Sequence, residues 1–180
     1  NAWVPSQGDS PIGAGDHDEY GDPYDNMGNF SAYGHFNVYF KNYLSWVPNT
    51  SVKSVSRTGT YRVKAHDHRE SKTSVRALKI GKNSGRDYWV SVRHWLVGDE
   101  IMLRWGLKSG SSMSGDGSQL LDMTPETRRA FEESQPRDHS LQMGNTFHDG
   151  SRRVSVTPVA RGGDGRELWV DMRVVYGSVA

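Results

Sequence analysis

The seven histidines are the residues of this sequence best suited to chemistry, because imidazole binds metals and transfers protons near neutral pH. They are His17, His35, His66, His68, His94, His139 and His148. None of them is followed by glutamate, so the sequence contains no H-E-x-x-H motif. In zinc peptidases that motif supplies two metal ligands and the carboxylate that takes a proton from zinc-bound water. We therefore expect no peptide hydrolysis by this chain alone.

Two other groups of polar residues have spacings that occur in metal sites. The segment His66-Asp67-His68 could place two imidazoles on one side of an extended chain, although a polar turn at a strand end is the favoured interpretation. The second group is acidic and consists of Asp16, Asp18, Asp22 and Asp25. It loosely resembles a calcium loop but lacks the fixed glycine and terminal glutamate of an EF-hand. Calcium stays open as an alternative.

Charge and composition exclude several classes of partner. Lysine and arginine number 22 against 21 aspartates and glutamates, which leaves a net charge of +1 and gives no reason to expect nucleic acid as a partner. No stretch approaches the roughly 18 apolar residues of a membrane span. The absence of cysteine excludes disulfides and thiolate metal sites. Because the first residue is Asn1, we expect further sequence upstream.

The elements that must position these side chains divide into a turn-rich start, one helix and many strands. Residues 1–29 are rich in Gly, Asp, Pro and Asn, a composition typical of turns and loops. Apolar residues then recur with helical spacing, which predicts an amphipathic helix over about 34–45 that starts near Ser31 or Gly34 and ends before Pro48. Its apolar face consists of Phe36, Tyr39, Phe40, Tyr43 and Leu44.

Beyond Pro48 the apolar period falls to two, which predicts short strands separated by polar turns. The alternating segments lie at 61–65, 78–80, 88–92, 101–105, 154–159 and 168–176. Residues 161–166 read as a hairpin connection, and residues 107–119 as a surface loop. Six to eight strands of this kind indicate an antiparallel β-sandwich, so the fold class is mainly β.

A resemblance to a known family rests on two adjoining segments. Residues 19–28 read E-Y-G-D-P-Y-D-N-M-G, and residues 34–46 contain the pattern G-H-F-N-x-[YF]-x-K-x-x-L-x-W. Both resemble signatures of the gametolysin-like and related M6-like zinc metallopeptidases, a branch of the metzincins. The likeness is strongest over 19–46 and more diffuse over 75–175. The pattern more often has an apolar residue or glycine at the positions of Asn26 and Ser45.

This resemblance implies roles for particular residues. Met27 would be the methionine of the Met-turn, a tight turn beneath the three zinc-binding imidazoles, where a thioether fills the floor of the site without acting as a ligand. Tyr24 and Gly28 would support that turn. His17 and His35 would lie at the periphery of the active site. The zinc ligands of the intact parent would lie outside this chain, so no catalytic or metal-binding residue is expected here.

The resemblance also implies an organisation and a function. Residues 1–48 would be the C-terminal part of a metzincin-like catalytic domain, and residues 49–180 would form an appended β-sandwich domain. The parent would be a secreted zinc endopeptidase that hydrolyses peptide bonds in proteins. The alternative is a non-catalytic extracellular β-sandwich module that binds protein or glycan. A row of exposed tryptophans among Trp89, Trp95, Trp105 and Trp169 would favour that alternative, although core positions are expected for them.

Overall fold

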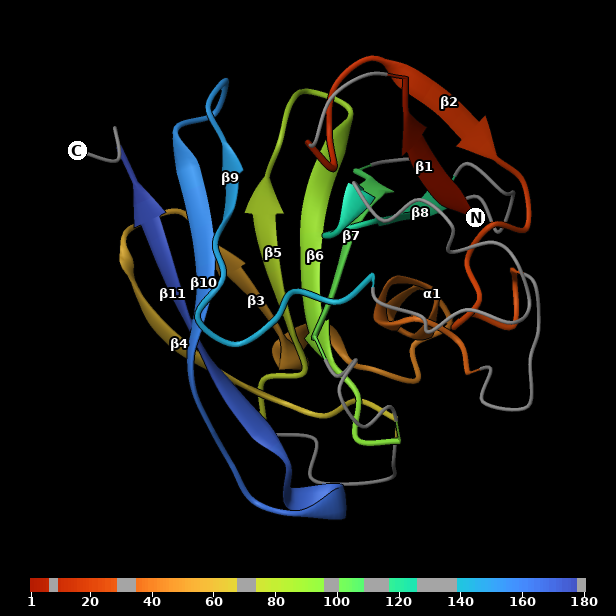
Figure 1. Cartoon of the computed structure of the whole chain (residues 1–180). Helices are drawn as coiled ribbons and strands as arrows, with labels where there is room; N and C mark the ends of the chain where they lie inside the picture. The colour runs from red at the N-terminus through yellow and green to blue at the C-terminus, as the bar shows by residue number, and fades with distance from the viewer. Residues whose placement is uncertain are drawn as a thin grey trace.

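The computed structural model describes residues 1–6, 10–28, 35–67, 74–95, 101–108, 117–125 and 139–177. Within these ranges the chain is mainly β (Figure 1). The strands are β1 (Ala2–Pro5), β2 (Gly15–Asp18), β3 (Val52–Val55), β4 (Gly59–Lys64), β5 (Ala77–Gly81), β6 (Arg86–Val92), β7 (Ile101–Leu107), β8 (Ser118–Leu121), β9 (Phe147–Asp149), β10 (Val154–Gly162) and β11 (Trp169–Tyr176). They are joined by one α-helix, α1 (Val38–Tyr43), and two 3-10 turns, η1 (Asn49–Ser51) and η5 (Gly165–Glu167).

The strands form two sheets, as expected for a β-sandwich. The larger sheet has seven strands in the order β2-β1-β8-β7-β6-β5-β3, and the smaller has four in the order β4-β11-β10-β9. Most neighbours are antiparallel, but β1 runs parallel to β8 and β3 runs parallel to β5. The purely antiparallel sandwich predicted from sequence is therefore corrected to a mixed one.

The main core lies between the two sheets. It is explained by the alternation of apolar and polar residues along the strands. Alternate residues of a strand point to opposite faces, so β-branched and aromatic residues at every second position create one apolar face. Leu78, Ile80 and Val90 supply that face in the large sheet, and Val170 and Met172 supply it in the small one; each is at most 1% exposed. The strand segments predicted beyond residue 48 correspond to β4, β5, β6, β7, β10 and β11.

Two strands at the start of the chain were not predicted. Residues 1–29 were expected to be loop, but β1 and β2 pair with each other, and β1 also pairs with β8 through Ala2 opposite Leu120. β2, Gly-Asp-His-Asp, has little intrinsic preference for sheet, and β1 is only four residues long, so pairing with each other and with β8 stabilises them. The ranges 1–48 and 49–180 therefore share one sheet.

The helix is shorter than the predicted span of about 34–45. Its N-cap is Asn37, whose side-chain Oδ1 accepts a hydrogen bond from Phe40 N at 3.0 Å, so the helix starts at Val38 instead of near Ser31 or Gly34. After Tyr43 the backbone leaves the helix, and Ser45 takes a left-handed φ of 60°. A glycine adopts that conformation without strain, whereas a serine pays a small conformational cost there.

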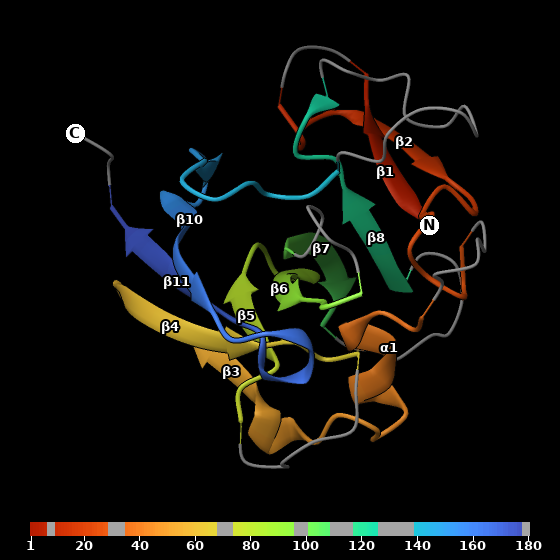
Figure 2. The same ribbon diagram turned by 60° about the horizontal axis from the view of Figure 1, so that its bottom comes forward.

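The helix lies on the face of the large sheet away from the small one (Figures 1 and 2). Tyr39 packs edge to face against Trp89 of β6, with ring centroids 5.4 Å apart, and Phe40 is 1% exposed. Tyr39 and Phe40 of the predicted apolar face are buried within the chain's second apolar cluster, because Trp89 and Ala77 point to this side of the sheet. Phe36 and Leu44 are half-buried, and Tyr43 is 43% exposed.

The other two connections predicted from the sequence, the hairpin and the long loop, are confirmed only in part. β10 and β11 form the predicted hairpin, with Gly162 opposite Trp169. The predicted loop 107–119 starts after Leu107, but its last residues, Ser118 and Gln119, are buried positions of β8; residues 109–116 lie outside the described ranges. In the described part of the chain, no helix has the length and apolarity needed to cross a membrane.

Candidate functional site

The segment Asp22–Gly28 forms a tight turn that carries Met27. Gly28 N donates a hydrogen bond to Asp25 O at 2.8 Å, which closes a four-residue turn. The Asp25 carboxylate accepts a second bond from Met27 N at 3.0 Å, and the Asp22 carboxylate accepts one from Tyr24 N at 2.9 Å. Aspartate side chains that bond backbone N–H groups two residues on stabilise turns in this way. Met27 is partly buried and packs against the cluster that contains α1.

Gly28 occupies a place where no larger residue fits. A Cβ atom at this position would lie 2.0 Å from Asp22 O, which is backbone and cannot move aside alone. We expect Gly28→Ala to destabilise the fold by about 1–3 kcal/mol, because the turn must open to remove the clash. Urea unfolding measures the change. The control is Gly85→Ala, where the nearest atom is Asn83 Oδ1 at 3.8 Å; equal stability of the two variants would contradict the tight turn.

Buried charges hold this turn against the large sheet. Arg104 of β7 reaches Asp22 through Nε at 3.1 Å and Nη2 at 2.6 Å, and both residues are 1% exposed. Asp25 accepts a hydrogen bond from the amide of Asn37, the N-cap of α1. Burial, followed by the neighbouring Asp22 carboxylate, raises the pKa of Asp25. The two aspartates of the D-P-Y-D pattern thus tie the turn to the sheet and the helix.

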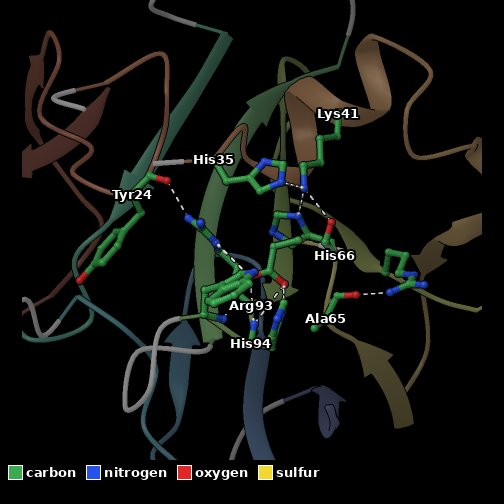
Figure 3. Close-up of polar contacts among 10 residues, drawn as sticks. Tyr24, His35, Lys41, Ala65, His66, Arg93 and His94 are labelled. Carbon is green, nitrogen blue, oxygen red and sulfur yellow. Dashed lines mark hydrogen bonds and ion pairs between the residues drawn. The ribbon is translucent and has the colours of Figure 1, made fainter. Parts of the chain in front are cut away.

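A second chain of contacts continues from the turn to the end of β4 (Figure 3). Arg93 Nη1 donates to Tyr24 O at 2.6 Å, and Arg93 Nε lies 3.8 Å from the Asp67 carboxylate. That carboxylate also pairs with the imidazole Nδ1 of His94 at 2.9 Å and accepts the backbone N–H of Trp95 at 3.2 Å. Burial alone would raise the pKa of Asp67, but the hydrogen bonds from His94 and Trp95 lower it overall.

Lys41 stands between two imidazoles at the centre of this region (Figure 3). Its Nζ lies 2.6 Å from His66 O, 3.1 Å from His66 Nδ1 and 3.4 Å from His35 Nε2. An ammonium donates all three bonds, which assigns the proton of His66 to Nε2 and that of His35 to Nδ1. In the described part of the chain, no carboxylate lies within ion-pair distance of Lys41, which is 4% exposed.

Burial and positive neighbours shift all three groups toward their neutral forms. Burial lowers the pKa of Lys41 from near 10.5 to about 7; Asp67 opposes this shift, and Arg93 and Arg76 add to it. Burial, followed by the Lys41 charge, lowers the pKa of His35 to about 4 and that of His66 well below its usual value. At neutral pH the two imidazoles are therefore neutral, and Lys41 exchanges its proton near physiological pH. This is the proton-exchanging part of the site.

The structure places the predicted site residues in separate surroundings. Tyr24 is 1% exposed, and its hydroxyl lies 3.3 Å from His139 Nδ1. His35 is half-buried beside Lys41. His17 is exposed on β2, where its Nδ1 lies 2.6 Å from Gln119 Nε2. Tyr24 and Met27 share the turn, and Arg93 links that turn to the Lys41 region, whereas His17 contacts a different strand.

The described residues do not fit a zinc or calcium site. Among them, no group of three or more His, Asp or Glu side chains could hold a metal ion. The carboxylates of Asp22 and Asp25, two members of the loose calcium pattern, are occupied by Arg104 and Asn37. His66 and Asp67 are buried at 3% and 5% exposure, so the expected polar turn is an interior one, and His68 lies outside the described residues. We therefore derive no chemical step through a metal in this chain.

Several residues of this network were not singled out from the sequence. Lys41 and Asn37 lie outside the apolar face predicted for the helix but are 4% and 2% exposed. Arg93 directly follows β6, and Arg104 lies within β7; both strands consist largely of apolar residues. That apolar context is the one sequence signal that could have indicated buried arginines.

Comparison with protein-family models, with curated proteins and with solved structures finds no match for this chain.

Proposed function

We propose that this chain is the C-terminal part of a secreted zinc-dependent endopeptidase of the gametolysin-like branch of the metzincins. Residues 1–48 contribute the Met-turn and the helix after it to the catalytic domain. The zinc ligands and the glutamate that activates water belong to a preceding part of the parent protein. The chain alone then performs no hydrolysis.

The observation that carries this proposal is the turn around Met27. A methionine beneath a zinc site has to be held rigidly, because it shapes the floor on which the imidazoles rest. Here the turn is fixed by two aspartates whose carboxylates bond its own backbone, and by two buried arginines, Arg93 just after β6 and Arg104 in the middle of β7. Met27 itself remains partly exposed. This arrangement supports a turn built to present its methionine to another part of the protein.

The test compares the 180-residue chain with the same chain preceded by its natural upstream segment. For the longer protein we expect one bound zinc and casein cleavage that 1,10-phenanthroline abolishes. For the short chain we expect neither, with zinc measured by atomic emission after dialysis. A Met27→Leu variant of the longer protein should retain the metal better than Met27→Asp, which places a charged group on the floor of the site. Chelator-sensitive cleavage by the short chain would contradict the proposal.

The binding-module alternative depends on exposed tryptophans, and the structure gives it limited support. Trp89 and Trp105 are each 4% exposed, and the ring of Trp169 is covered by the Arg62 guanidinium 3.6 Å above it. Trp95 is 64% exposed. Of the four, Trp95 alone has an open indole, so they form no exposed row; Trp46, outside this set, is 60% exposed and packs edge to face on Phe36. The peptidase remains the favoured function.

A further inference from the structure

A groove separates α1 from the adjoining strands of the large sheet, on the side of α1 away from the Lys41 network. Its accessible volume is about 140 Å³, and its lining includes Tyr39, Tyr43, Lys79, Trp89, Leu107 and Lys108. Aromatic rings and one leucine form the apolar part, and two lysines supply the charge. Neither the Met27 turn nor any of the six histidines that the structure describes contributes to it.

The charges around the groove are unbalanced. Asp87 is the carboxylate that both lysines share, at 3.3 Å from Lys79 Nζ and 3.4 Å from Lys108 Nζ. The Asp87 side chain is 5% exposed, whereas each lysine side chain is 35% exposed, so the anion is buried and the cations reach solvent. Among the described residues, two ammonium groups against one carboxylate leave an excess of one positive charge at the rim.

The polar groups of the groove favour an anion. The two ammonium groups can only donate, and in the described residues the one carboxylate beside them is already shared. The hydroxyls of Tyr39 and Tyr43, which also line the groove, can donate as well as accept. A ligand that binds between the lysines therefore brings acceptor oxygens and a negative charge. Apolar carbons next to that charge would pack on the tyrosine rings and Leu107.

The size of the groove limits how large that ligand can be. A volume of about 140 Å³ is below the roughly 300 Å³ at which pockets for drug-sized molecules begin. It suits one side chain and leaves the rest of the partner outside. We propose that this groove binds a glutamate or aspartate side chain of a protein partner, with its carboxylate between Lys79 and Lys108. The inference goes beyond the proposed peptidase function and does not depend on it.

The test uses two short peptides that differ only in charge. Acetyl-Ala-Glu-Ala-amide is titrated into the ¹⁵N-labelled chain and compared with acetyl-Ala-Gln-Ala-amide, while amide and indole resonances are followed by NMR. We expect the glutamate peptide to shift the signals of Leu107, Lys108 and the Trp89 indole, with a dissociation constant of about 1–10 mM. The glutamine peptide should bind at least about fivefold more weakly, and added salt should weaken the glutamate peptide alone.

Variants of the two lysines test whether the glutamate peptide binds in this groove or is attracted non-specifically to any exposed lysine. Lys79→Met and Lys108→Met should each weaken the glutamate peptide several-fold, and the double variant should remove the difference between the two peptides. Lys53→Met is the matched control, because Lys53 is an exposed lysine on β3 that does not line the groove. Equal binding of the two peptides, shifts located elsewhere, or an unchanged preference in the double variant would each overturn the proposal. So would the absence of shifts up to roughly 20 mM peptide.

Discussion

Replacing Arg104 by methionine is expected to destabilise the fold by about 3–5 kcal/mol. The substitution removes the guanidinium that contacts Asp22 at 2.6 Å and leaves that carboxylate buried without its cation. Both side chains are 1% exposed, so water cannot replace the lost partner. A solvated ion pair would lose far less, about 0–1 kcal/mol, because its charges remain hydrated. Chemical unfolding of the purified variant measures the difference.

The matched comparisons for this prediction are a second variant and a double variant. Lys64→Met breaks a 3.0 Å pair with Glu167, which is 62% exposed, and should cost under about 1 kcal/mol. Asp22→Asn combined with Arg104→Met removes both charges, retains an acceptor for Tyr24 N, and should be more stable than Arg104→Met alone. If Arg104→Met were no more harmful than Lys64→Met, the turn that carries Met27 would not depend on this ion pair.

The second large effect is the pH dependence that Lys41 imposes on stability. Its pKa is near 10.5 in the unfolded chain and about 7 in the fold, because the fold buries it among His35, His66, Arg93 and Arg76, and the opposing charges of Asp67 and Asp25 do not offset this. Between these values the unfolded state binds more protons than the folded state. Stability therefore rises as the pH rises through this window, by at most about 1.4 kcal/mol per pH unit.

The variant Lys41→Met removes this proton and should flatten the curve. Between pH 7 and 9.5 the free energy of unfolding of the unaltered chain should rise by about 3 kcal/mol more than that of Lys41→Met. Lys64→Met, which removes an exposed lysine, should retain the original pH dependence. Unfolding in urea at a series of pH values measures both. Parallel curves for the unaltered chain and Lys41→Met would show that Lys41 is not desolvated in the fold.

The sequence predicted those parts of the fold that depend on local pattern. The strands β4, β5, β6, β7, β10 and β11 have apolar residues at every second position, and burial on one face is enough to define them. The strands β1, β2 and β8 lack that pattern. They exist because Ala2 lies opposite Leu120 and Asp18, a pairing between segments far apart in the chain. A single sequence contains no signal for such a pairing.

The sequence indicated the turn that carries Met27, but not the buried charged residues that surround it. The tight turn with Met27 lies where the E-Y-G-D-P-Y-D-N-M-G segment indicated, because Asp25 and Gly28 have strong local turn preferences. The charges beneath it come from other elements, and Arg93 and Arg104 reach the turn only through the tertiary fold. Lys41 lies outside the apolar face predicted for the helix, and lysine is almost never fully buried unless it is paired, so its burial could not be expected from the sequence.

The most direct test of the central claim is the coding sequence immediately upstream of Asn1. The proposal rests on residues 19–46, and it requires a zinc-binding motif in a part of the protein that precedes them. We predict an in-frame H-E-x-x-H-x-x-G-x-x-H, or the same stretch ending in Asp, within roughly one hundred residues of Asn1, because that is the usual size of a domain. If the reading frame there contains no such stretch, the peptidase proposal is wrong and Met27 is not a Met-turn methionine.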